Sequence, residues 1–239
     1  KIWKKINLFS ENRGINRYEA LYIFFEELKK SNLLSHKNFA YPKLNVLNRL
    51  KKSNILLTNN NLKNLKNEID NKIFLDIKKA IRWSSYVNEE VKIKVKNLPP
   101  ISGAQSTLNY LYKHADIIVI SNTPRKTLLR DWRYSNINNK VSLICGQETG
   151  NKTDILKAAT FGKYDKNKIL MVGDSPSDYY AAKNNQVYFY PIIPNYEKSS
   201  WNFLLDEGLS SFFSNKYNRI AEKKKILEFE SAIDAKLLH

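Results

Sequence analysis

The clearest guide to the fold is the stretch ILMVGDSPSD at residues 169–178. Its first four residues form a continuous apolar run, which is typical of a strand buried on both faces, and Gly173 follows that run. Two carboxylates come next, four residues apart: Asp174 in the expected turn and Asp178 on the first turn of a helix that Pro176 can begin. The stretch therefore predicts a strand, a turn and a helix, with both carboxylates close to the turn.

Similar apolar runs, each followed by a turn, lie at residues 116–120, 141–145 and 187–190. Helical patterns cover residues 126–132, 153–160 and 177–184 between them. Strands that alternate with helices predict an α/β fold with a Rossmann-like parallel sheet covered by helices on both faces. Right-handed crossovers bring the carboxyl ends of such strands to one edge, where open α/β sheets bind ligands. The polar residues that directly follow the strands are therefore the candidates for chemistry.

The N-terminal part of the chain has a different texture. Apolar residues recur at helical spacing over residues 17–30, 44–50 and 62–83, and no convincing strand precedes Asn97. Leu98-Pro99-Pro100 then breaks the helical pattern. We therefore expect an all-helical domain at residues 1–97 and an α/β core domain at residues 98–239.

Composition excludes several classes of protein. Cys145 is the only cysteine, so the chain has no intramolecular disulfide and no thiolate metal cluster, and its apolar surroundings predict a buried strand residue. The formal charge of +17 suits a polyphosphate partner, but the lysines are scattered among asparagines rather than clustered, so we do not expect nucleic acid as a partner. With no apolar run long enough to span a bilayer and no signal-peptide pattern at the start, we expect a cytoplasmic protein without membrane contact.

The first predicted strand is followed by Ser121, Asn122 and Thr123, where a hydroxyl and backbone N–H groups at a helix start could hold a phosphate oxygen. Turn formation is the simpler explanation for these residues. Lys152 follows a glycine-flanked loop after the second strand and could neutralise a transferring phosphoryl group, although a lone lysine there is more often simply exposed.

The third strand end supplies oxygen ligands. Asp174 and Asp178 could together hold a hard cation such as Mg²⁺. The alternative is structural: Asp174 would cap the helix and Asp178 would only complement its dipole. The residues of this motif alone leave these two interpretations open.

Taken together, the three strand ends resemble the second, third and fourth motifs of the haloacid dehalogenase-like superfamily. The motifs are SNTPR at residues 121–125, then Lys152, then GDSPSD at residues 173–178. The resemblance implies phosphomonoester hydrolysis through an aspartyl-phosphate, with Mg²⁺ as cofactor, a small phosphorylated metabolite as substrate and the helical domain as cap. It also implies that Ser121 hydrogen-bonds the phosphoryl group, that Lys152 neutralises it, and that Asp174 and Asp178 complete the metal site.

One motif of the family is absent from the sequence. Its members carry a nucleophilic Asp-x-Asp after an apolar strand that precedes the cap, and no Asp-x-Asp triplet occurs in the 239 residues. We expect that strand upstream of Lys1; the alternative is a non-catalytic phosphate- and metal-binding protein that acts as a sensor. A mutase or a dehalogenase would use the same fold. In the cap, Arg13 and Arg17 could bind an anionic substrate, or they could simply cap or solvate the first long helix.

Overall fold

The computed structural model describes most of the chain, namely residues 1–31, 33–34, 37–53, 55–95 and 98–238. Two compact units make up the fold. The first consists of Lys1–Asn7 and Ile15–Lys96, and the second of Leu8–Gly14 and Asn97–His239. Leu8–Gly14 therefore belongs to the second unit, although we expected it inside the helical domain. The expected boundary falls at residue 97, which lies outside the described residues.

The first unit is built from helices in all of its described secondary structure. These are α1 (Ile2–Leu8, whose last residue belongs to the second unit), α2 (Arg17–Lys30), α3 (Asn45–Lys52), α4 (Asn59–Asn64), the short η2 (Leu65–Asn67) and α5 (Asn71–Lys94). Helix α2 begins where the Asn16 side chain accepts a hydrogen bond from the Tyr18 N–H, which satisfies an otherwise unpaired donor of the first turn. The core of this unit contains Tyr18, Leu47, Leu62 and Ile77, which are at most 1% exposed.

The helical pattern at residues 62–83 spans more than one helix in the structure, because the helix ends after η2 and α5 begins at Asn71. Asp70 causes the break: its Oδ1 accepts hydrogen bonds from the N–H groups of Lys72 and Ile73, at 2.9 and 3.3 Å, and so starts a new helix. The apolar spacing continues across the break because Leu65 and Ile77 enter the same core. Because the apolar periodicity is continuous, it gave no sign of the helix N-cap at Asp70.

In the second unit, strands alternate with helices as predicted. Its strands are β1 (Ile118–Ile120), β2 (Leu143–Cys145), β3 (Leu170–Gly173) and β4 (Tyr188–Pro191). Its helices are α6 (Ala104–Leu111), α7 (Arg125–Tyr134), α8 (Lys152–Thr160), α9 (Pro176–Asn185), α10 (Glu197–Phe203), α11 (Leu209–Phe213) and α12 (Arg219–Ile233), with a π-helical turn at Leu204–Gly208 and short 3-10 turns at Asn138–Lys140, Gln147–Thr149 and Lys166–Lys168. The expected strand at each of the four apolar runs is confirmed, and Cys145 is buried as predicted.

The strands are parallel, but they form two separate pairs in the described part of the chain rather than one continuous sheet. Strand β1 pairs with β2, with Val119 opposite Ile144, and β3 pairs with β4, with Met171 opposite Phe189. Each pair is connected through a helix, α7 in the first and α9 in the second, as parallel strands require. The α/β class with parallel strands is confirmed; the single sheet is not formed by the described strands.

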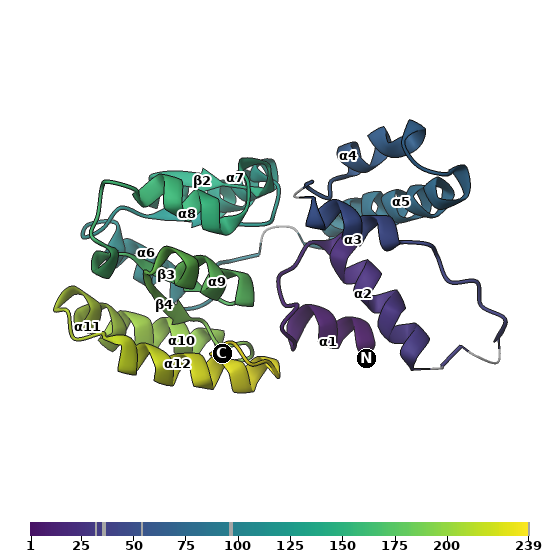
Figure 1. The fold of residues 1–239 in the computed structure, drawn as a ribbon. Helices are drawn as coiled ribbons and strands as arrows, with labels where there is room; N and C mark the ends of the chain where they lie inside the picture. The colour runs from purple at the N-terminus through teal and green to yellow at the C-terminus, as the bar shows by residue number, and fades with distance from the viewer. Residues whose placement is uncertain (32, 35–36, 54, 96–97, 239) are drawn as a thin grey trace. The chain divides into compact units, whose positions relative to one another are not determined.

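Helices cover these strands and bury the second core (Figure 1). Helix α9 packs on β3 and β4, α12 packs on β4, and α8 contacts both α9 and β1. Ala181, Phe189, Phe229 and Ile233 are fully buried in this core, and Ile120 from β1 packs against its edge. The carboxyl ends of β1 and β3, where the candidate residues follow, are thus parts of one packed unit.

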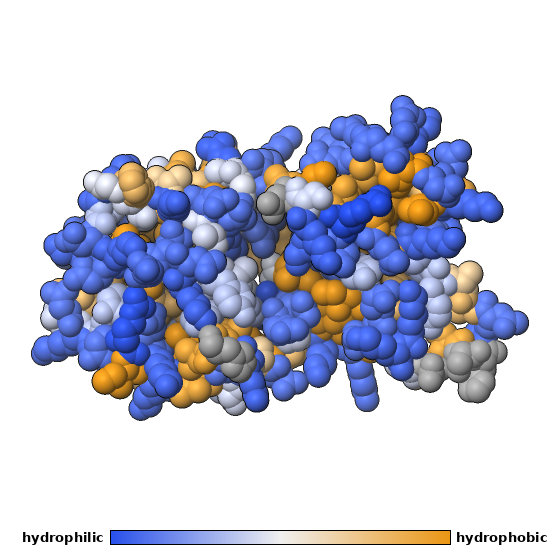
Figure 2. Space-filling view, viewed as in Figure 1, coloured by the Kyte–Doolittle hydropathy of each residue, from blue (hydrophilic) through white to orange (hydrophobic). Residues whose placement is uncertain are grey.

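The outer surface is mainly hydrophilic on the face shown in Figure 2, with smaller apolar areas between the polar side chains. Across the described residues, no helix is both long enough and apolar enough to cross a membrane.

Candidate functional site

The centre of the candidate site is a buried ion pair between the second and third strand ends. The Lys152 Nζ lies 2.6 Å from Asp178 Oδ1 and 3.3 Å from Ser175 Oγ. The side chains of Lys152 and Asp178 are only 12% and 5% exposed. Such burial is costly for either charge alone, so the two charges stabilise each other in place. Lys152 is therefore held in position by its partners and is not the simply exposed lysine that is more common at such a place.

Local sequence explains why Asp178 points back at the strand end. Ser175 is the N-cap of α9, and Asp178 Oδ2 accepts hydrogen bonds from the Ser175 N–H at 3.1 Å and the Ser175 hydroxyl at 2.7 Å. This is the reciprocal half of a capping box, with Pro176 at the first helical position. Gly173 makes room for it, since a Cβ at that position would lie 2.4 Å from Asp178 Oδ2. The N-cap residue of α9 is thus Ser175. The structural alternative, in which Asp174 would cap this helix, is wrong.

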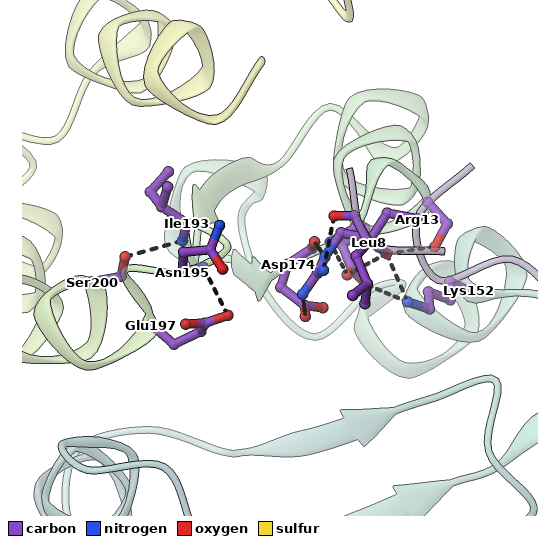
Figure 3. Close-up of polar contacts among 11 residues, drawn as sticks. Leu8, Arg13, Lys152, Asp174, Ile193, Asn195, Glu197 and Ser200 are labelled. Atoms are coloured by element: carbon purple, nitrogen blue, oxygen red, sulfur yellow. Dashed lines mark hydrogen bonds and ion pairs between the residues drawn. The ribbon is translucent and has the colours of Figure 1, made fainter. Parts of the chain in front are cut away.

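Asp174 faces a different cation, Arg13 (Figure 3). The Arg13 Nε donates to the Asp174 carbonyl oxygen and an Arg13 terminal nitrogen donates to Asp174 Oδ2, both at 2.6 Å. The other terminal nitrogen donates to the Leu8 carbonyl oxygen at 3.1 Å. The Asp174 side chain is 53% exposed and that of Arg13 is 12% exposed. Asp174 is therefore the accessible carboxylate of the predicted pair, and it is held on one oxygen.

The residues after β1 form a turn whose polar groups are hydrogen-bonded within the turn, to β2 and to Gly14. The Ser121 hydroxyl accepts a hydrogen bond from the Thr123 N–H at 3.1 Å, and the Ser121 N–H continues the strand ladder to the Cys145 carbonyl oxygen. Asn122 is exposed, and its Nδ2 donates to the Gly14 carbonyl oxygen at 2.9 Å. The structure thus joins Asn122 to the Leu8–Gly14 segment, while no described contact links the Ser121 hydroxyl to Lys152.

Arg17, the second predicted substrate-binding arginine, has its described contacts inside the first unit. One terminal nitrogen donates to Asn88 Oδ1 at 2.6 Å and to the Ser84 carbonyl oxygen at 3.1 Å, which ties α2 to α5. Burial lowers the pKa of its guanidinium, while the charge of neighbouring Tyr18 acts in the opposite direction. These contacts give Arg17 a packing role in the helical unit, and its role in substrate binding stays a prediction.

The described residues supply only part of the ligand set of a magnesium site. Both Asp178 oxygens are used by Lys152 and Ser175, which leaves Asp174 with an accessible carboxylate. The described residues contain no group of three His, Cys, Asp or Glu side chains arranged to hold a metal. Mg²⁺ is commonly bound through one or two carboxylates, with waters and substrate phosphate completing its shell. Asp174 meets that description as a single ligand.

Sequence reasoning missed two members of this arrangement, Ser175 and Gly14. Ser175 carries a readable signal, because a serine followed three residues later by a carboxylate before an apolar run is the pattern of a capping box. Gly14 has a φ of +75°, and a Cβ there would lie 2.9 Å from the Ser175 Cβ. No local pattern announces that contact, because 161 residues separate the two positions.

Two hollows of about 410 and 420 Å³ lie beside the loop after β4, near Tyr196. That loop is held by polar contacts, among them the Ile193 N–H to Ser200 Oγ at 3.0 Å (Figure 3). The residues that line these hollows include neither Lys152, Asp174 nor Asp178. The ion pairs at the strand ends are therefore distinct from these cavities.

Comparison with known proteins identifies the family. A family model described as haloacid dehalogenase-like hydrolase matches residues 47–192, which is more than half of the chain and includes all three strand ends. No curated protein and no solved structure matches the chain significantly.

Proposed function

Because the chain belongs to the haloacid dehalogenase-like hydrolase family, we propose that it is a Mg²⁺-dependent phosphohydrolase acting on a small phosphorylated metabolite. One observation carries this proposal: Lys152 follows β2, Asp174 and Asp178 follow β3, and these strand ends carry the ion pairs Lys152–Asp178 and Arg13–Asp174. Those strand ends are where open α/β folds bind their ligands.

Each residue at the strand ends has its own role in binding the phosphoryl group or the metal in this proposal. Asp178 and Ser175 fix the Lys152 ammonium group, which then offsets the negative charge of the phosphoryl group without having to reorganise during the reaction. Ser121 and the amide of Asn122 would bind phosphoryl oxygens at the end of β1, and the Thr123 amide would join them once it leaves the Ser121 hydroxyl. Asp174 would hold Mg²⁺, which supplies charge neutralisation on the phosphate.

The nucleophile in this proposal is an aspartate of an Asp-x-Asp motif, and the 239 residues contain no such triplet. We place it on a strand outside the given sequence. In the described part of the chain the strands form only two separate pairs, which supports this placement, since unpaired edges expose backbone donors and acceptors that a further parallel strand would satisfy. The proposed reaction therefore belongs to the full-length gene product.

A second function is favoured by the Arg13–Asp174 contact and by the missing triplet. A non-catalytic protein would keep the phosphate- and metal-binding strand ends, with Arg13 as the partner of Asp174 when no metal is bound. Such a protein would bind phosphate compounds and turn none of them over.

Phosphate release separates these two functions. The full-length gene product is incubated with a panel of phosphate monoesters and Mg²⁺, alongside Asp174→Asn and the matched control Asp165→Asn, whose side chain is 79% exposed. We expect release by the parent protein and by the control, and a loss of at least about a hundredfold in Asp174→Asn, because the metal's carboxylate is gone. Binding of phosphate esters with no release from any of them would favour the sensor.

A further inference from the structure

The segment Leu8–Gly14 occupies an unusual position in the chain. It belongs to the second unit, although Lys1–Asn7 before it and Ile15–Lys96 after it belong to the first. The contacts that this segment makes with the ends of β1 and β3 therefore lie inside the second unit.

The attachment points are the candidate functional residues. Arg13 is bonded to the carbonyl oxygen and the carboxylate of Asp174, and the Gly14 carbonyl oxygen accepts from Asn122. Gly14 also approaches Ser175 so closely that it has no room for a side chain. The segment is thus fastened to the ends of β1 and β3, where we propose that phosphate and metal bind.

Charge makes this attachment sensitive to a metal. Asp174 carries one negative charge, and Arg13 already provides a cation at 2.6 Å from its Oδ2. A divalent cation on the same carboxylate would be repelled by the guanidinium, and either the ion pair must separate or the metal must bind against that repulsion. Arg13 is only 12% exposed, so solvent screens this repulsion less than at an open surface.

We propose that Arg13 is an internal counter-ion of Asp174 that competes with a divalent cation for this carboxylate, so that metal binding loosens Leu8–Gly14 from the end of β3. This inference rests on the proposed function, because it takes Asp174 as a metal ligand. Arg13 is then a positioning residue that couples metal occupancy to the attachment of Leu8–Gly14 within the second unit. Its predicted role as a direct substrate ligand would require the same guanidinium to leave Asp174.

Calorimetric titration with Mg²⁺ tests the competition in the full-length protein. Arg13→Gln removes the competing charge, and we expect its affinity for Mg²⁺ to rise on the order of tenfold. Arg130→Gln is the matched control, because Arg130 is exposed, lies in the same unit and pairs with Asp131. Its affinity should equal that of the parent protein. An unchanged or weaker affinity in Arg13→Gln would overturn the inference.

A second measurement uses the parent protein alone and does not depend on the folding of a variant. Amide hydrogen exchange across residues 8–14 should become faster when Mg²⁺ is added to saturation, since the Arg13 contacts are released. Unchanged or slower exchange there would contradict the inference while leaving Asp174 as a metal ligand. Absence of Mg²⁺ binding in the parent protein and in Arg13→Gln alike would instead overturn the proposed metal site itself.

Discussion

Replacing Lys152 with methionine is the sharpest test of the buried ion pair. Methionine retains much of the length and the apolar stem of lysine but leaves the Asp178 carboxylate, 5% exposed, without its counter-ion. Removing one partner of a buried pair costs roughly 3–5 kcal/mol. Two Ser175 donors still bind Asp178 and Lys152 is itself 12% exposed, so we expect about 3 kcal/mol of destabilisation, at the lower end of that range.

Chemical denaturation followed by circular dichroism measures this change in the free energy of unfolding. Lys168→Met is the matched control, since Lys168 is 66% exposed and lies 3.9 Å from Asp165, and it should cost less than about 0.5 kcal/mol. Combining Lys152→Met with Asp178→Asn should cost less than the sum of the two single changes, because both remove the same interaction. A Lys152→Met protein as stable as the parent would show that the Lys152–Asp178 ion pair does not stabilise the fold.

Two other substitutions test the packing around the site and the core beneath it. Gly173→Ala should destabilise the protein by about 2 kcal/mol or more in the same denaturation assay, because its Cβ would lie 2.4 Å from the Asp178 carboxylate oxygen. Burial raises the pKa of Tyr217 above its ordinary value and that of Tyr190 to about 12. The unfolded chain therefore loses these protons first as pH rises above about 10, so the free energy of unfolding should fall from there to about pH 12. Tyr217→Phe, which also loses the 2.7 Å bond to the Phe189 carbonyl oxygen, should show a shallower fall; an equal slope would contradict this cause.

The sequence was most informative where a pattern is local. Apolar runs bounded by turns located each of the four strands that the structure describes, because a buried parallel strand needs apolar residues on both faces. The helix at Arg17–Lys30 was also predicted with its observed limits, since the Asn16 cap and the apolar spacing agree. The break before α5 was missed, because Asp70 starts a helix without interrupting the apolar periodicity.

Most members of the candidate site were predictable, Ser175 and Gly14 excepted, but its pairings were not. Asp174 and Asp178 look equivalent in the sequence. In the fold, however, Asp178 forms an ion pair with Lys152 and Asp174 forms one with Arg13. These pairings join residues 26 and 161 positions apart, and no spacing rule specifies contacts of that kind. Arg13 in particular was expected in the helical domain, whereas its segment packs with the α/β unit.

The most direct test of the proposed hydrolase is the metal dependence of phosphate release by the full-length protein. With its best monoester as substrate, we predict that a chelator abolishes release, that added Mg²⁺ restores it, and that Asp174→Asn does not recover at any Mg²⁺ concentration at which the parent protein is saturated. Release that continues in the presence of chelator, or that is unaffected by Asp174→Asn, would contradict the assignment of Asp174 and the Mg²⁺-dependent mechanism built on it.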